Sequence, residues 1–169
     1  TYFKDLTGQQ GVALGIGDDG ALINPSPDTQ LVMASDTLVE AVHFPADASG
    51  EQIATRALCV NLSDLAAMGA TPKWFTLALT MPKHLANDRW LKSFSSGLAD
   101  VAKEFDIALV GGDTTLGPLT VGITLLGEVP VGEALRRDSA LVGDAIYVTG
   151  TLADGAAALN MLKANVNKV

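Results

Sequence analysis

The sequence predicts an α+β fold in which helices cover a mixed or antiparallel sheet. Strand-like and helix-like segments alternate unevenly, with consecutive strands early and late in the chain, and this order disfavours a doubly wound parallel sheet. The composition, with 48% hydrophobic residues and 17 glycines, is typical of a packed globular protein.

Hydrophobic spacing predicts the individual elements. The apolar strand at residues 31–39 follows a turn-like segment. The next element has helical spacing and ends at Gly69, with Pro72 soon after it. In chain order, the main elements are a strand at 31–39, a helix at 51–68, a strand at 74–81, a helix at 88–105, a short buried strand at 107–110 that ends at Gly111-Gly112, and a long strand at 119–129.

The character of the chain changes near residues 136–143, which are basic and polar. An apolar segment at 145–149 follows and reads as a strand, and residues 154–162 read as a helix before a polar tail. We therefore interpret residues 1–138 as an N-terminal domain and residues 139–169 as the start of a second, truncated domain.

The charge balance argues against two classes of partner. The chain has 19 acidic and 11 basic residues, for a formal net charge of −8, which disfavours nucleic acid and anionic membranes. We see no signal-peptide pattern and no apolar run long enough to span a bilayer, so we expect a soluble, cytoplasmic protein. The single cysteine, Cys59, excludes an intrachain disulfide and a Cys-rich zinc site.

The first acidic motif, Gly15-Ile-Gly-Asp-Asp-Gly20, matches the pattern of the dinucleotide-binding fingerprint. We reject that interpretation because the fingerprint needs a helix after its third glycine, whereas residues 21–25 read as a strand and a turn. Asp18 and Asp19 would repel a pyrophosphate directly. A Mg²⁺ ion bound between these carboxylates and the phosphates would turn that repulsion into attraction. A plain Asp-Asp-Gly turn is the alternative.

Two further acids interrupt apolar elements. Asp36 lies inside an apolar strand beside Ser35, whose backbone oxygen is as plausible a metal ligand as its hydroxyl. A strand-end Asp that caps a turn is the alternative there. Asp64 follows Asn61 by three residues on one helical face, among residues that otherwise favour burial. A solvent-facing strip of a half-buried helix is the alternative for Asp64.

The last acidic motif is Gly111-Gly112-Asp113, directly after the short buried strand. Paired glycines let backbone N–H groups approach an anion, and an acid at a strand end can share a metal; a plain glycine turn is the alternative. His43 could contact a ligand, although a lone histidine is more often structural. There is no Walker-type loop and no kinase-type catalytic loop.

Taken in this order, the motifs resemble the thiamine-monophosphate kinase family, whose superfamily includes aminoimidazole ribonucleotide synthetase and selenophosphate synthetase. The resemblance covers nearly the whole chain, and the motifs are specific in combination. The matching stretches are GIGDDGA (15–21), SDTLVEAVHF (35–44), NLSDLAAMGATP (61–72), GGDTT (111–115) and GDAIYVTG (143–150).

The resemblance implies ATP-dependent phosphorylation of thiamine monophosphate to thiamine diphosphate with several Mg²⁺ ions. It also implies a homodimer whose N-terminal sheets close into a shared barrel, with residues 1–138 as the domain that binds ATP and magnesium. By position it implies metal binding by Asp18, Asp19, Ser35, Asp36, Asp64 and Asp113, substrate binding by His43, and ATP binding by Gly112, Asp113 and Arg137. The acceptor would be a phosphate, which is already anionic and needs no strong general base.

Some features depart from the family pattern. Ala41 stands where the family usually has glycine, and Ala34 where it often has a hydroxyl residue. Family members are roughly twice as long, in line with a two-domain enzyme whose second domain carries a further acidic motif. We therefore expect this chain to be inactive alone. The alternatives are another ATP-using synthetase of the superfamily and a non-catalytic module that binds nucleotide or metal.

Overall fold

The structure is a computed structural model and describes residues 2–3, 6–7 and 11–164. The chain divides into two compact units, Thr1–Arg136 and Arg137–Val169. Residues 165–169 of the predicted polar tail lie outside the described residues. No helix in the described part is both long and apolar enough to cross a bilayer.

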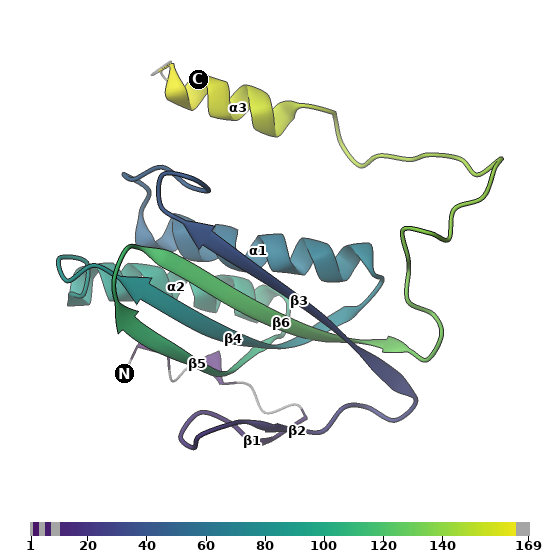
Figure 1. The fold of residues 1–169 in the computed structure, drawn as a ribbon, viewed down its shortest axis with the longest axis horizontal. Helices are drawn as coiled ribbons and strands as arrows, with labels where there is room; N and C mark the ends of the chain where they lie inside the picture. The colour runs from purple at the N-terminus through teal and green to yellow at the C-terminus, as the bar shows by residue number, and fades with distance from the viewer. Residues whose placement is uncertain (1, 4–5, 8–10, 165–169) are drawn as a thin grey trace. The chain divides into compact units, whose positions relative to one another are not determined.

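The first unit is built on a four-stranded sheet in the order β3-β6-β4-β5 (Figure 1). Strand β6 pairs antiparallel with β3 and with β4, whereas β4 and β5 are parallel. The sheet is therefore mixed, which confirms the predicted α+β fold class, and β3 and β5 are its edges. The strands are β3 (Thr29–Val39), β4 (Thr71–Met81), β5 (Ala108–Leu116) and β6 (Thr120–Pro130).

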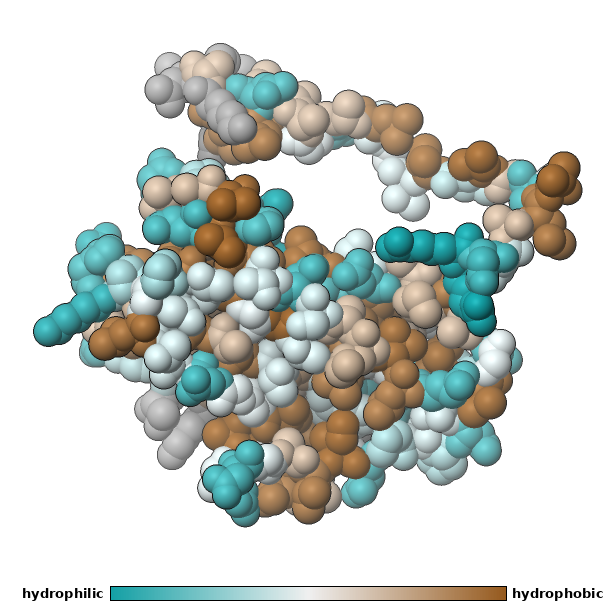
Figure 2. Space-filling model, viewed as in Figure 1, coloured by the Kyte–Doolittle hydropathy of each residue, from teal (hydrophilic) through white to brown (hydrophobic). Residues whose placement is uncertain are grey.

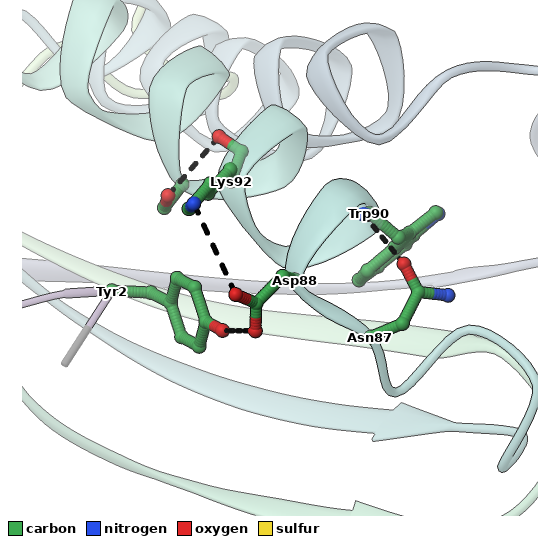
Figure 3. Close-up of polar contacts among 6 residues, drawn as sticks. Tyr2, Asn87, Asp88, Trp90 and Lys92 are labelled. Carbon is green, nitrogen blue, oxygen red and sulfur yellow. Dashed lines mark hydrogen bonds and ion pairs between the residues drawn. The ribbon is translucent and has the colours of Figure 1, made fainter.

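Two helices, α1 (Gly50–Ala67) and α2 (Asp88–Glu104), pack against each other and cover one face of this sheet (Figure 1). Their bounds lie within a residue of those predicted from hydrophobic spacing. Both helices begin at local capping residues. Ser49 and Gln52 form a reciprocal capping box at the start of α1. At the start of α2, the Asn87 side chain accepts a hydrogen bond of 3.1 Å from the Trp90 backbone N–H (Figure 3).

The first turn of α2 also holds the N-terminal segment. The Tyr2 hydroxyl donates to Asp88, and Lys92 lies 3.9 Å from the other oxygen of the same carboxylate (Figure 3). The hydrogen bond to Asp88 raises the pKa of Tyr2 above its ordinary value. Tyr2 thus brings the start of the chain alongside the four-stranded sheet, where Phe3 packs on the core.

Neighbouring residues of β4 show how the two faces of the sheet differ. Phe75 belongs to the main core under α1 and α2, whereas Trp74 belongs to a separate small cluster with Ala108 and Val110. Successive side chains of a strand point to opposite faces, so Trp74 lies on the face without helices. We call this the open face. The small sheet of β1 (Val12–Leu14) and β2 (Leu22–Ile23) packs over Trp74 at one end of it.

One strand prediction was too short. The strand expected to end at Gly111-Gly112 continues to Leu116 as β5. A register shift between Phe75 and Thr76 of β4 lets the pairing resume beyond Val110, so the glycines lie inside the strand. Gly112 has a φ of +148°, and a side chain there would overlap the carbonyl oxygen of Leu77. Glycine is therefore required for the close approach of β5 to β4.

The second unit contains α3 (Asp154–Lys163). The prediction of a strand at 145–149 was wrong: these residues are not in a strand. A strand needs a neighbour to bond its backbone groups, and the described part of this unit holds no other strand. Its described side chains are exposed, including apolar ones such as Ile146 and Tyr147, and Figure 2 shows hydrophobic atoms along this stretch.

Candidate functional site

A pocket of about 750 Å³ opens in the first unit where three distant segments meet. It joins the N-terminal segment, the loop between β1 and β2, and the adjoining strands β4 and β5. Two of the four acidic motifs therefore come together. The lining residues are Phe3, Thr7, Ile16, Gly17, Asp18, Asp19, Gly20, Ala21, Thr76, Leu77, Leu109, Val110, Gly111, Gly112, Asp113 and Thr114.

The loop between β1 and β2 carries the paired aspartates. After Gly20 the chain enters β2 rather than a helix, so the rejection of the dinucleotide fingerprint is confirmed. The Asp18 carboxylate accepts a hydrogen bond of 2.8 Å from the Asp19 backbone N–H, which turns it toward its own backbone. Both side chains are exposed. Because the Asp19 carboxylate makes no comparable bond within the described residues, it is the freer of the two to bind a ligand.

Gly112 and Asp113 come from the edge strand β5. Asp113 lies opposite Ala78 of β4, which in turn lies opposite Gly122 of β6. Directly opposed residues project to the same face. The neighbours of Asp113 on its face are therefore an alanine and a glycine, which leave space beside the carboxylate. The Asp113 side chain is exposed, and space beside it remains available for a ligand.

Ser35 and Asp36 lie on the other edge strand, β3. The hydroxyl oxygens of Ser35 and Thr124 are 3.0 Å apart. Asp36 lies opposite Ile123, in the row that continues through Leu77 to Gly112. Three strand spacings separate the ends of that row, or about 14 Å. A single chain therefore does not bring Asp36 together with Gly112 or its neighbour in β5.

Asn61 and Asp64 lie in α1 in different environments. Asn61 is fully buried and its Nδ2 donates to the Ala57 carbonyl at 3.0 Å, whereas Asp64 is exposed. The argument that Asp64 needs a ligand because it is buried therefore fails. Neither residue lines the pocket.

His43 lies in the loop after β3, outside the residues that line the pocket. Its Nδ1 accepts a hydrogen bond of 3.0 Å from the Val39 backbone N–H. A backbone N–H can only donate, so Nδ1 carries no proton and Nε2 is free to donate to a ligand. Ala41, which precedes it, has a φ of +61°, in the left-handed region that favours glycine. Arg137 belongs to the second unit and is not among the residues that line the pocket.

The donor set of the pocket suits magnesium that arrives with a phosphorylated ligand. Asp18, Asp19 and Asp113 supply oxygen donors and make no ion pair with another described residue. Among the described residues, no three acidic, histidine or cysteine side chains converge closely enough to hold a metal alone. Magnesium bound with nucleotides needs only one or two carboxylates, because phosphates and water complete its shell. The residues therefore fit this mode of binding.

Some pocket residues were not predicted from the sequence. Phe3 and Thr7 reach the pocket from the N-terminal segment, and Thr76 from the middle of β4. None of them belongs to an acidic or glycine-rich motif, and no local pattern marks them. A groove of about 580 Å³ along the outer side of α1 includes Cys59 but none of the predicted site residues. Partial burial and Glu104 raise the pKa of the Cys59 thiol, which reduces its reactive thiolate form.

The chain is similar in sequence to thiamine-monophosphate kinases of several bacteria. The thiamine-monophosphate kinase of Escherichia coli (strain K12) is 51% identical over 152 residues, which cover 90% of this chain and 46% of that protein. That of Bacillus subtilis (strain 168) is 38% identical over 159 residues, covering 92% of this chain and 49% of that protein. The chain thus spans about half the length of the curated relatives it matches.

Solved structures agree with the sequence comparison. The crystal structure of thiamine-monophosphate kinase from Stenotrophomonas maltophilia K279a has a TM-score of 0.87 and 48% identity, covering 95% of this chain and 50% of that one. The structure of AaThiL complexed with AMPPCP and TMP has a TM-score of 0.78 and 30% identity, covering 91% of this chain and 49% of that one. The family model of the AIR synthase related protein, N-terminal domain, matches residues 17–129. The chain therefore belongs to the family of AIR synthase related proteins and contains its N-terminal domain.

Proposed function

We propose that the protein carrying this chain transfers a phosphoryl group from ATP to thiamine monophosphate and forms thiamine diphosphate in the cytoplasm. The observation that carries this proposal is the pocket, which joins an aspartate-bearing loop to the glycine-containing strand β5. Relatives of up to 51% identity have this activity in their names, and a 30% identical one was solved with AMPPCP, an ATP analogue, and TMP.

In this proposal, Asp18, Asp19 and Asp113 hold magnesium ions that neutralise charge on the phosphates of ATP. Gly112 leaves room for the nucleotide beside β5, and Arg137 is proposed to bind phosphates of ATP. The acceptor phosphate is already anionic, so the residues of the chain act by positioning and by charge neutralisation, without a general base. His43 binds the substrate, and its free Nε2–H would donate to an acceptor atom.

We further propose that the active form is a homodimer with composite metal sites. Ser35 and Asp36 lie on one edge strand and Asp113 on the other, too far apart to share an ion within one chain. If β3 of one copy pairs with β5 of a second copy, the two sheets close into a barrel. The edge that carries Ser35 and Asp36 then lies next to the partner's edge that corresponds to β5, which carries Asp113. Edge strands have unpaired backbone groups that favour such pairing. The 70% exposure of Met33 on β3 agrees with a covered surface in the assembly.

The activity is tested by incubating the protein that carries this chain with ATP, Mg²⁺ and thiamine monophosphate. Thiamine diphosphate and ADP are the expected products, measured by chromatography. Turnover of another acceptor, with no thiamine diphosphate formed, would show that the protein is a different synthetase of the superfamily. Nucleotide binding without turnover of any acceptor would indicate a binding module.

Composite sites are tested by subunit complementation. Asp36→Asn and Asp113→Asn are each expected to abolish Mg²⁺-dependent phosphoryl transfer. A mixed dimer of the two variants would hold one doubly altered site and one intact site, so it should regain up to about half of the wild-type activity. If each site lies within one subunit, every site in the mixed dimer keeps one substitution, and no activity should return.

A further inference from the structure

Glu128 of β6 is a buried carboxylate with an unusual partner. It is 7% exposed and forms no ion pair with another described residue. Both of its oxygens bind Ser26 instead: Oε1 accepts from the Ser26 backbone N–H at 2.6 Å and Oε2 accepts from the Ser26 hydroxyl at 2.8 Å. A buried carboxylate is costly unless hydrogen bonds compensate it. Ser26 supplies that compensation from a segment more than 100 residues away in the chain.

Ser26 lies in the turn that joins β2 to β3, between Pro25 and Pro27. The flanking prolines restrict the backbone of this turn. Other bonds tie the same turn to the four-stranded sheet: the Thr29 hydroxyl donates to the Ser26 carbonyl at 2.7 Å, and the Val131 N–H donates to the Asp28 carbonyl at 3.1 Å. The bond to Glu128 therefore fixes the turn against the end of β6.

The turn is the base of the hairpin formed by β1 and β2. Next to it, the Asn24 N–H donates to the Gly11 carbonyl at 2.7 Å and closes the hairpin. Gly11 sits so close to Trp74 that a Cβ there would lie 2.6 Å from the indole ring. The far end of the same hairpin is the loop with Asp18 and Asp19, which lines the same pocket as β5. A tilt at the base would move these carboxylates at the tip.

We propose that Glu128 is a positioning residue of the pocket. By binding Ser26 through both oxygens, it fixes the β1–β2 hairpin on the open face and holds Asp18 and Asp19 opposite Asp113. Glu128 is not among the residues that line the pocket, and it acts through the hairpin. The consequence for ligand binding rests on the proposed function, whereas the restraint on the hairpin does not.

The test compares four variants of the protein that carries this chain. Glu128→Ala removes both acceptors, and Ser26→Ala removes only the hydroxyl bond. Glu128→Gln keeps the shape, with Oε1 able to accept from the Ser26 N–H and Nε2 able to donate to its hydroxyl. Ser49→Ala is the matched control, because it removes the capping box of α1 and lowers stability away from the hairpin.

Two readouts separate positioning from general stability. The first is hydrogen exchange of the amides of residues 12–23, with residues 120–127 of β6 as the internal reference. The second is the dissociation constant of Mg²⁺·AMPPCP. For Glu128→Ala we expect faster exchange in the hairpin alone and binding weakened by at least roughly tenfold. Ser26→Ala should give an exchange rate and a dissociation constant between those of Glu128→Ala and the wild type. Glu128→Gln should bind Mg²⁺·AMPPCP within about threefold of the wild-type affinity. Ser49→Ala should leave both readouts unchanged.

The outcomes distinguish the possible failures. Unchanged hairpin exchange in Glu128→Ala would overturn the proposal at its first step. Faster exchange with wild-type affinity for Mg²⁺·AMPPCP would show that the bond to Ser26 serves only the fold. Equal weakening in Ser49→Ala would lead to the same conclusion. If the wild-type protein does not bind Mg²⁺·AMPPCP, the proposed function is wrong, and the exchange data alone then decide whether Glu128 restrains the hairpin.

Discussion

The two faces of the four-stranded sheet differ in how many apolar side chains they bury and in how many polar side chains they leave exposed. On the face under α1 and α2, Leu125 is fully buried within one continuous apolar core. On the open face, its neighbour Thr124 is half-buried and contacts Ser35, and the β1–β2 hairpin covers only the end around Trp74. Figure 2 shows pale, weakly polar atoms beside hydrophobic ones over the first unit.

The residues that stabilise the fold therefore differ from the acidic residues that line the pocket. Burial of apolar side chains is the main favourable contribution to folding, and it lies almost entirely on the helix-covered face. Of the pocket residues, Asp18, Asp19 and Asp113 are exposed and make few contacts that the fold requires. Acids in this setting are free to meet a charged ligand without a large cost to the free energy of unfolding.

The largest difference between the two faces is expected from a matched pair of substitutions in β6. Leu125→Ala should lower the free energy of unfolding by about 2–5 kcal/mol, because it leaves a cavity in the main core. Thr124→Ala, one residue away on the open face, should change it by no more than about 1 kcal/mol. Urea denaturation measures both. Similar losses for the two variants would mean that the open face is covered in solution, as in the proposed dimer.

A smaller loss is expected from Gly112→Ala. The new methyl group would overlap the Leu77 carbonyl oxygen at a φ of +148°, so β5 must move away from β4. We expect a loss of about 1–3 kcal/mol in the free energy of unfolding, together with weaker nucleotide binding. Gly20→Ala is the control for stability, since a Cβ there meets no atom within 4 Å. Wild-type stability in Gly112→Ala would show that the edge strand tolerates displacement.

Ala41→Gly should act in the opposite direction. Ala41 adopts a φ of +61° in the loop that holds His43, and glycine relieves that conformation, although it also gains freedom in the unfolded chain. The net effect should be a gain of up to about 1 kcal/mol, seen as a higher melting temperature. A lower melting temperature would mean that the loop is not strained at this position.

The smallest effect on stability is expected from Asp113→Asn. The exposed carboxylate makes no ion pair with a described residue, so the free energy of unfolding should stay within about 0.5 kcal/mol of wild type. Mg²⁺-dependent nucleotide binding should nevertheless fall sharply, because an amide replaces a charged oxygen ligand. Calorimetric titration with Mg²⁺·AMPPCP measures this loss. A clear drop in stability would place Asp113 among the structural residues of the sheet.

Local signals were enough to predict several parts of the molecule. Hydrophobic spacing predicted the bounds of α1 and α2 to within a residue. The capping bonds of Ser49 and Asn87, which the structure adds, also involve only neighbours in the sequence. Predictions from local signals were wrong where the structure of a segment depends on a partner that is distant in the sequence. The extension of β5 depends on its pairing with β4, and residues 145–149 stay outside any strand because the described part of their unit offers no partner strand.

The candidate site divides in the same way. Residue types alone made Asp18, Asp19, Asp36 and Asp113 candidate ligands of a cation, because a carboxylate beside glycines or inside an apolar strand is unfavourable without a compensating partner. Which of these carboxylates lie close together depends on how distant segments of the chain fold onto one another. Strand order places Asp36 and Asp113 on opposite edges of one sheet, and a buried bond between Glu128 and Ser26 anchors the hairpin that carries the other two. Residue types determine which bonds are chemically possible. The folding of distant segments onto one sheet determines which of these bonds form.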